Sequence, residues 1–188
     1  MLLPSAFGIL ASGSGGGGGY TAPAMNRTGV VGNIAANAAG YGVSGFDNGS
    51  YCYLAAGKTT GKWYWEAESA NFILFGVTTT PASFRTFGGY SSINGGIYNF
   101  GGTFWNEWGA VPPSLGTIAV GVVIGFALDV PGKTLRIYLG NVLADTIALT
   151  GISGAIYPMF AFQSSPTTQV RLGPSGCTYT PPSGYTYI

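Results

Sequence analysis

Apolar and polar residues alternate along several short segments of the chain, with the period of two that is typical of a β-strand. The clearest case is the segment 62–69. Its alternation places Trp63, Trp65 and Ala67 on one face and Tyr64, Glu66 and Glu68 on the other. We expect the first face to pack into the core and the two carboxylates of the second face to point into water.

A second pair of segments predicts a β-hairpin. Residues 122–129 and 134–139 flank the sequence Val130-Pro131-Gly132-Lys133. Proline fixes φ and glycine accepts a positive φ, so we expect Gly132 to supply the left-handed residue of a tight turn. On the second strand Leu135, Ile137 and Leu139 are expected in the core, and Thr134, Arg136 and Tyr138 on the opposite face.

Between residues 26 and 188 no segment shows sustained helical periodicity, and β-favouring runs are separated by turn residues. Further strands are expected at 72–78, 96–100, 156–163 and 168–172. This is the pattern of an all-β domain.

The first 25 residues differ in texture from the rest. The apolar side chains are Leu2, Leu3, Phe7, Ile9 and Leu10, and a run of serine and glycine follows at 12–19. Such a run is a flexible tether by composition. The segment is either a frayed terminus or an anchor that docks on a partner. We therefore divide the chain into an apolar anchor with a poly-glycine tether, residues 1–25, and a β-domain, residues 26–188.

Charge is scarce in this chain. Hydrophobic residues make up 46% of the sequence and charged residues only 7%, against about 25% in an average soluble domain. The net charge is +1, and the basic residues are scattered along the sequence. This pattern argues against nucleic-acid binding. The longest apolar run, 118–128, is too short to span a bilayer, so no membrane insertion is expected.

Histidine is absent, which excludes a Ser-His-Asp or Cys-His catalytic arrangement and imidazole metal sites. Cys52 and Cys177 fit no metal-binding spacing and form either a disulfide or two unpaired thiols. Glu66 and Glu68, about 7 Å apart on one strand face, would suit glycoside hydrolysis. The alternative is that both acids are simply solvated. We expect no catalytic residue, metal or cofactor.

Two segments are candidate binding loops. The first contains Trp105, Asn106, Glu107 and Trp108 between glycine and proline pairs, and could form a sugar platform or a protein-binding hot spot. The alternative is that a tryptophan closes the edge of the core. The second spans 85–94, where Arg85, Tyr90 and Asn94 have the composition of an adaptable binding surface. The alternative there is an ordinary connecting loop.

Four segments together resemble the SPRY domain family. They are Gly61-Lys62-Trp63-Tyr64-Trp65-Glu66, the hairpin 124–139, Phe160-Ala161-Phe162, and Tyr179-Thr180-Pro181-Pro182-Ser183-Gly184-Tyr185. The resemblance implies a bent antiparallel β-sandwich that binds partners through loops at one end. Two places depart from the family pattern: Gly140-Asn141 stands where Asn-Gly is usual, and Arg171-Leu172-Gly173 where Asn-Phe-Gly is common.

Low charge, abundant glycine and threonine, and an apolar peptide on a glycine string resemble bacteriophage virion proteins. The leading hypothesis is a non-enzymatic, multicopy virion protein of the tail or fibre. It would dock on other virion proteins through its N-terminal peptide and recognise a host-surface glycan or protein. The first alternative is a capsid decoration or tail-tip stabilising protein. The remote alternative is an enzyme that cleaves glycans with Glu66 and Glu68.

Overall fold

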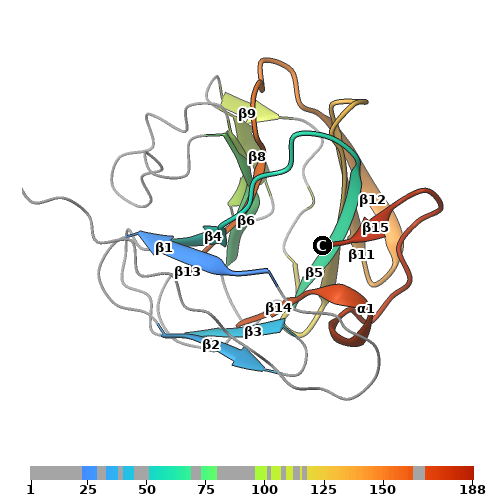
Figure 1. The fold of residues 1–188 in the computed structure, drawn as a ribbon. Helices are drawn as coiled ribbons and strands as arrows, with labels where there is room; N and C mark the ends of the chain where they lie inside the picture. The colour runs from blue at the N-terminus through green and yellow to red at the C-terminus, as the bar shows by residue number, and fades with distance from the viewer. Residues whose placement is uncertain are drawn as a thin grey trace, which may run out of the picture.

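The computed structural model describes the chain in segments that are mostly β-strand (Figure 1). They are residues 23–28, 33–37, 40–44, 51–68, 73–79, 96–100, 103–106, 109–111, 115, 118–162 and 168–188. The strands form two antiparallel sheets that face each other, which confirms the expected β-sandwich. The predicted N-terminal anchor and tether lie outside the described residues.

The first sheet, here sheet A, has seven strands among the described residues. In spatial order they are β1 (Met25–Thr28), β4 (Tyr51–Leu54), β13 (Tyr157–Phe162), β6 (Ile73–Thr78), β7 (Gly96–Phe100), β8 (Thr103–Asn106) and β9 (Gly109–Val111). The strands predicted at 72–78, 96–100 and 156–163 are confirmed within two residues at either end.

The second sheet, sheet B, runs in the order β12 (Val142–Ala148), β11 (Thr134–Leu139), β10 (Val123–Asp129), β5 (Lys62–Glu68), β14 (Thr168–Arg171), β3 (Gly40–Ser44) and β2 (Asn33–Asn37). The short β15 (Thr186–Tyr187) pairs with the first half of β5 in parallel. Strand β14 pairs with the second half of β5. Strand β5 is therefore held by segments far away in the sequence on both sides.

The core lies between the sheets and centres on Phe126 of β10. The ring of Trp65 stacks on Phe126 at 5.3 Å between centroids. Phe75 and Phe160 come from sheet A and meet Phe126 edge-on at 5.0 and 6.5 Å. All four side chains are buried. This aromatic cluster joins the two sheets, because large rings bury the most apolar area per residue.

The predicted hairpin is present, but its turn is built differently. Strands β10 and β11 pair from Ile124 and Leu139 to Asp129 and Thr134. The left-handed residue is Lys133, with φ of 48°, and not Gly132. The backbone N–H of Gly132 donates to Oδ1 of Asp129 at 2.8 Å, and a Cβ on Gly132 would lie 2.7 Å from that carboxylate. Glycine is needed there to make room for Asp129.

The inward side chains of this hairpin follow the prediction. Leu135 and Ile137 are fully buried, and Leu139 packs against the core while partly exposed. Arg136 and Tyr138 lie on the opposite face and keep partial contact with solvent. The period of two therefore assigned the faces of β11 correctly.

Strands β11 and β12 are joined by the two residues Gly140 and Asn141. Both have positive φ, 54° and 69°, as a type I′ hairpin turn requires. The reversed order of these two residues, relative to the family pattern, therefore keeps the turn. A β-bulge follows, because Ile137 faces Asp145 and Tyr138 faces Leu143. Ala144 is the extra residue on the edge strand β12.

Within the described part of the chain the sole helix is α1 (Gly173–Gly176), a four-residue helix that follows β14. No helix there is long and apolar enough to cross a membrane.

Of the two states considered for the cysteines, the structure has free thiols. Cys52 is buried in β4, and Cys177 is half-buried after α1. The described residues contain no cluster of three or more His, Cys, Asp or Glu that could hold a metal ion.

Candidate functional site

Most of the predicted binding residues lie outside the described residues. These are Arg85, Tyr90, Asn94, Glu107 and Trp108. The backbones of Trp105 and Asn106 are described, and both residues belong to β8. The five apolar residues of the predicted anchor, Leu2, Leu3, Phe7, Ile9 and Leu10, also lie outside the described part. These assignments stay predictions, and what the structure adds is the position of the strands that carry the two loops.

The stretch 101–113 was expected to be a loop, and this was wrong. It contains β8 and β9, which pair as a hairpin with Asn106 opposite Gly109. Thr103, Phe104 and Trp105 are β-favouring residues that continue the ladder from β7. The flanking glycines and prolines were taken as loop signals, although they also punctuate short strands.

The two predicted binding loops leave sheet A at the same end. Thr78, where β6 ends, pairs with Gly96, where β7 begins, so the connection 80–95 departs there. Ile97 pairs with Asn106, so the connection 107–108 of the β8–β9 hairpin departs beside it. The strand ends that carry the two predicted binding loops are therefore neighbours in sheet A.

Three connections of known conformation complete this end of the sandwich. The connection 55–61 pairs with 149–156 through hydrogen bonds in both directions between Lys58 and Ile156, at 2.8 and 2.9 Å. It also accepts a hydrogen bond at Gly61 from Val130 in the turn 130–133. Lys133 in that turn accepts one from Leu149. We call this end of the sandwich, at the top of Figure 1, the loop end.

Partly exposed aromatic rings and a lysine line the loop end. Tyr53 and Tyr157 meet edge-on at 6.1 Å. The amino group of Lys58 lies 3.9 Å from the centroid of the Trp63 ring, within the range of a cation–π contact. The indole N–H of Trp63 donates to the carbonyl oxygen of Thr60 at 2.6 Å, which fixes the ring. Burial lowers the pKa of Lys58.

Glycine at position 57 makes this arrangement possible. A Cβ there would lie 2.7 Å from the ring of Tyr157. The Tyr157 ring therefore crosses directly over the backbone of the 55–61 connection. Sequence reasoning missed Tyr53, Gly57, Lys58 and Tyr157, because the pairing of Lys58 with Ile156 spans almost 100 positions.

Basic residues that are scattered in the sequence gather in the folded chain. The three lysines of the protein, Lys58, Lys62 and Lys133, all lie at the loop end. Lys62 and Asp129 form an ion pair at 2.7 Å, which lowers the pKa of Asp129 and raises the pKa of Lys62. The lysines therefore gather at one end of the sandwich, whereas Arg171 lies near the far end of β5, where it pairs with Glu68.

Next to this pair the ring of Tyr185 lies near two cations. The Lys62 amino group is 5.7 Å and the Arg136 guanidinium 6.0 Å from the ring centroid. A β-turn places the ring there: the N–H of Tyr185 donates to the carbonyl of Pro182 at 3.0 Å, and Gly184 has φ of 84°. The turn belongs to the Tyr-x-Pro-Pro-x-Gly-Tyr motif, so this motif shapes one border of the loop end.

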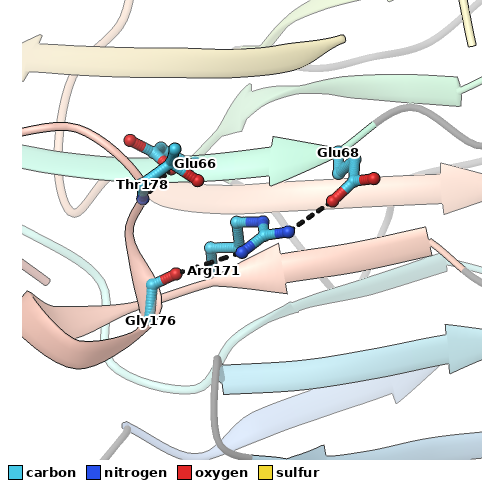
Figure 2. Close-up of polar contacts among 5 residues, drawn as sticks. All are labelled: Glu66, Glu68, Arg171, Gly176 and Thr178. Carbon is cyan, nitrogen blue, oxygen red and sulfur yellow. Dashed lines mark hydrogen bonds and ion pairs between the residues drawn. The ribbon is translucent and has the colours of Figure 1, made fainter. Parts of the chain in front are cut away.

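Glu66 was expected to face water, and the structure contradicts this. Its side chain is fully buried, at 0% exposure. Oε2 accepts the N–H of Thr178 at 2.6 Å (Figure 2). Oε1 accepts the N–H of Tyr179 at 2.8 Å and the hydroxyl of Tyr64 at 2.9 Å. Alternation assigned Glu66 to the outer face of sheet B correctly, but the segment after α1 covers that face.

Tyr64 belongs to the same buried cluster. Its ring crosses Gly125 of the neighbouring strand, where a Cβ would lie 2.6 Å from the Tyr64 hydroxyl. Burial raises the pKa of Tyr64, and the neighbouring Glu66 adds to this shift. The ring of Tyr187 contacts Tyr64 edge-on at 6.3 Å. The hydroxyl of Tyr64 is thus committed to holding Glu66 in place.

Glu68 lies at the far end of β5 and has a different environment. It pairs with Arg171 of β14, whose other terminal nitrogen donates to the carbonyl of Gly176 at 3.5 Å (Figure 2). The Glu68 side chain keeps 34% of its surface exposed. In Figure 2 Glu66 lies beside Thr178 and Glu68 points toward Arg171, so the two carboxylates engage different partners.

Comparisons with known proteins bear on the fold. No protein-family model matches the sequence, and no curated protein sequence is similar to it. Among solved structures, the SPRY domain of human HERC1 is similar with a TM-score of 0.59 and 15% identity, over 73% of this chain and 91% of that chain. The TRIM65 PSpry domain is similar with a TM-score of 0.52 and 17% identity, over 69% and 78%.

A third similar structure is stonustoxin, with a TM-score of 0.54 and 19% identity. The similarity covers 73% of this chain but only 24% of the stonustoxin chain, so it concerns one part of that protein. At these identities the likeness concerns the fold. The two facing sheets, the hairpin β10–β11 and the folded-back terminal motif agree with it, and the chain therefore has the SPRY fold.

Proposed function

We propose that this chain is a non-enzymatic binding module that engages its partner at the loop end. The observation that carries the proposal is the common anchoring of the loops 80–95 and 107–108, beside partly exposed Tyr53, Tyr157 and Trp63. Loops presented by a rigid sandwich are a frequent site of recognition. Aromatic side chains supply large contact areas with little loss of conformational entropy.

The environment of the carboxylates supports a non-enzymatic role. Glu66 is buried and accepts three hydrogen bonds from the protein itself. Glu68 is held by Arg171. A catalytic acid must reach the glycosidic oxygen that it protonates, whereas Glu66 fastens the C-terminal segment to β5. Incubation with host-surface glycans should release no reducing ends, and release that stops in Glu66→Gln would overturn this part of the proposal.

For the biological setting, we propose a bacteriophage virion and attachment to the host surface. Low charge, abundant glycine and the apolar N-terminal peptide support this setting. The apolar residues at 2–10 would anchor each copy to another virion protein. Many copies on tethers would turn weak single contacts into firm attachment by avidity.

Electron microscopy of purified particles labelled with an antibody against residues 26–188 tests the setting. Label at the tail or its fibres supports host recognition, whereas an absence of label on every particle overturns the virion assignment. Replacing Leu2, Leu3, Phe7, Ile9 and Leu10 by Ser should abolish incorporation into particles. Unchanged incorporation would overturn the anchor.

A competition assay tests the binding end. Purified chain added to host cells should reduce phage adsorption, and an Arg85→Ala/Tyr90→Ala/Asn94→Ala variant should compete at least about tenfold less well if these residues are hot spots. The control is Val142→Thr at the opposite end of the sandwich, which should compete like the parent chain. Equal competition by all three proteins would place binding elsewhere.

A second candidate function, a capsid decoration or tail-tip stabilising protein, is favoured by one specific observation. On the edge strand β12 the side chains of Val142 and Leu143 are 70% and 51% exposed. Permanent interfaces are apolar and poor in charge. Label over the head, together with self-association in sedimentation that Val142→Lys abolishes, would favour this candidate over host recognition.

A further inference from the structure

We propose, resting on the binding role of the loop end, that its ligand is an anionic polysaccharide that carries carboxylate groups. The loop end combines two features that such a ligand needs. One is a local excess of positive charge, and the other is a pair of partly exposed aromatic rings next to the cations. Neither feature is visible in the composition, since the net charge of the whole chain is only +1.

The excess of positive charge follows from the ion pairs. Lys58, Lys62 and Lys133 lie at the loop end and Arg136 borders it, whereas Asp129 is its sole acid among the described residues. Asp129 is paired with Lys62. In the described part of the chain, Lys58 and Lys133 have no carboxylate within ion-pair distance. Two amino groups therefore remain to attract an anion.

The aromatic rings sit where the cations are. Lys58 covers one part of the Trp63 ring, and Tyr185 lies beside Lys62 and Arg136. Both rings retain partial contact with solvent. An aromatic face provides a flat apolar area for the C–H groups of a sugar ring, and a neighbouring amino group then pairs with its carboxylate. Exposed hydroxyls of Thr59 and Thr60 add hydrogen-bonding groups between the lysines.

The kind of cation favours a polysaccharide over a protein partner. Lysine is depleted in the core of protein interfaces, where arginine and large aromatic residues are enriched. The unpaired cations on the connections and turns of the loop end that the structure describes, Lys58 and Lys133, are lysines, and Arg136 borders this end on β11. A lysine amino group stays strongly hydrated and acts as a mobile point charge. Such groups suit a hydrated, repetitive polyanion better than a dry protein surface.

Affinity electrophoresis of the full chain tests the inference. The probe is polygalacturonate in the gel, and the controls are neutral dextran and poly-glutamate at matched charge concentration. The parent chain should be retarded by polygalacturonate at low salt, released as salt rises, and unaffected by dextran. Retardation by poly-glutamate should be weaker, because a peptide offers no sugar ring to the aromatic faces.

Variants locate the site. Lys58→Gln/Lys133→Gln should weaken retardation roughly tenfold, as expected for two partly exposed charges. Adding Val142→Lys/Leu143→Lys at the opposite end restores the net charge and should not restore binding. Tyr185→Leu should weaken binding several-fold, and Tyr185→Phe, which keeps the ring, should not. Thermal unfolding midpoints show whether each variant remains folded.

The outcomes separate this inference from the binding role itself. No retardation by polygalacturonate, equal retardation by poly-glutamate, or full rescue by the added lysines would overturn the anionic-polysaccharide ligand. If the chain still competes with phage adsorption in that case, the binding role stands and its ligand is of another class. If the chain neither binds polygalacturonate nor competes, both proposals fail.

Discussion

The buried carboxylate of Glu66 is tolerated because each of its two oxygens accepts at least one hydrogen bond. The two backbone N–H groups and the Tyr64 hydroxyl surround it on the outer face of sheet B. An unpartnered carboxylate in that position would be very costly. The same contacts attach the segment that follows α1 to the centre of the sheet, so one side chain links two elements more than 100 positions apart.

Substituting Glu66 tests this attachment. In Glu66→Gln one oxygen becomes an NH₂ group, so a backbone N–H of Thr178 or Tyr179 loses its acceptor. We expect the free energy of unfolding in urea to fall by about 1–3 kcal/mol. Glu68→Gln, with a half-exposed ion pair, is the matched control and should cost no more than about 1 kcal/mol. Equal effects of the two changes would show that Glu66 has no special role.

The buried side chain of Asp145 makes the stability of the fold depend on pH. Its side chain is 7% exposed, Oδ1 accepts the N–H of Thr146 at 2.6 Å, and Oδ2 has no hydrogen-bond partner. Burial raises the pKa of Asp145. The folded state then binds the proton more tightly than the unfolded chain. Its contribution to stability is complete below the ordinary aspartate pKa and is lost as the pH rises through the raised value.

Asp145→Asn should therefore raise the urea midpoint at pH 7, by about 1 kcal/mol in free energy of unfolding. The difference from the parent chain should shrink as the pH falls to about 3.5, where the aspartate is protonated in both states. A difference that stays constant over this range would mean that the charge of Asp145 is not the cause.

At the level of elements, the edge strand β12 is guarded in two ways. It carries the bulge at Ala144, and Asp145 points inward from it opposite Ile137. Bulges and inward charges both hinder an edge from pairing with another strand. The exposed Val142 and Leu143 nearby are thus less free to nucleate association than their exposure suggests.

The turn between β11 and β12 gives a prediction at this scale. Gly140 and Asn141 both have positive φ, and Asn followed by Gly is the preferred order in a type I′ turn. Exchanging them, Gly140→Asn with Asn141→Gly, should raise the free energy of unfolding by up to about 0.5 kcal/mol, since the order fits the turn better and surface changes are usually within this range. Thermal melting measures it. A lower midpoint in the exchanged variant would show that another contact fixes the present order.

Alternation and β-favouring runs along single segments predicted the hairpin β10–β11, three strands of sheet A (β6, β7 and β13) and the inward faces of β5 and β11, but not β8 and β9. These patterns failed where distant segments decide the outcome. The burial of Glu66 depends on Thr178 and Tyr179, and the gathering of Lys58 and Lys133 depends on pairing with the connection 149–156. The alternating pattern says which face a residue occupies but not what covers that face. Of the predicted site residues, only the backbones of Trp105 and Asn106 fall within the described part.

At the scale of the whole molecule, the alkylation rates of the two thiols measure how much of the fold must open to expose each one. Cys52 is buried in β4, and Cys177 lies at the half-buried start of the terminal segment. Burial raises the pKa of both thiols, which suppresses the reactive thiolate. In the native protein we expect slow alkylation by iodoacetamide, with Cys177 modified before Cys52, because local opening of the terminal segment suffices to expose it.

Mass spectrometry of quenched samples measures this order. The Cys52 rate should follow global unfolding as urea is added, and dithiothreitol should leave the melting temperature unchanged because both thiols are free. Faster modification of Cys52 than of Cys177 would contradict the depth order.

The parallel pairing of β15 with β5 has a consequence for biosynthesis. Strand β5 emerges from the ribosome early, but two of its neighbours, β14 and β15, are residues 168–171 and 186–187. Until those residues have left the exit tunnel, one side of β5 lacks partners. Long-range pairings of this kind slow folding. Sheet B therefore closes only after nearly all of the domain has been translated, and in the interval the nascent chain exposes an apolar strand that a ribosome-associated chaperone is suited to shield.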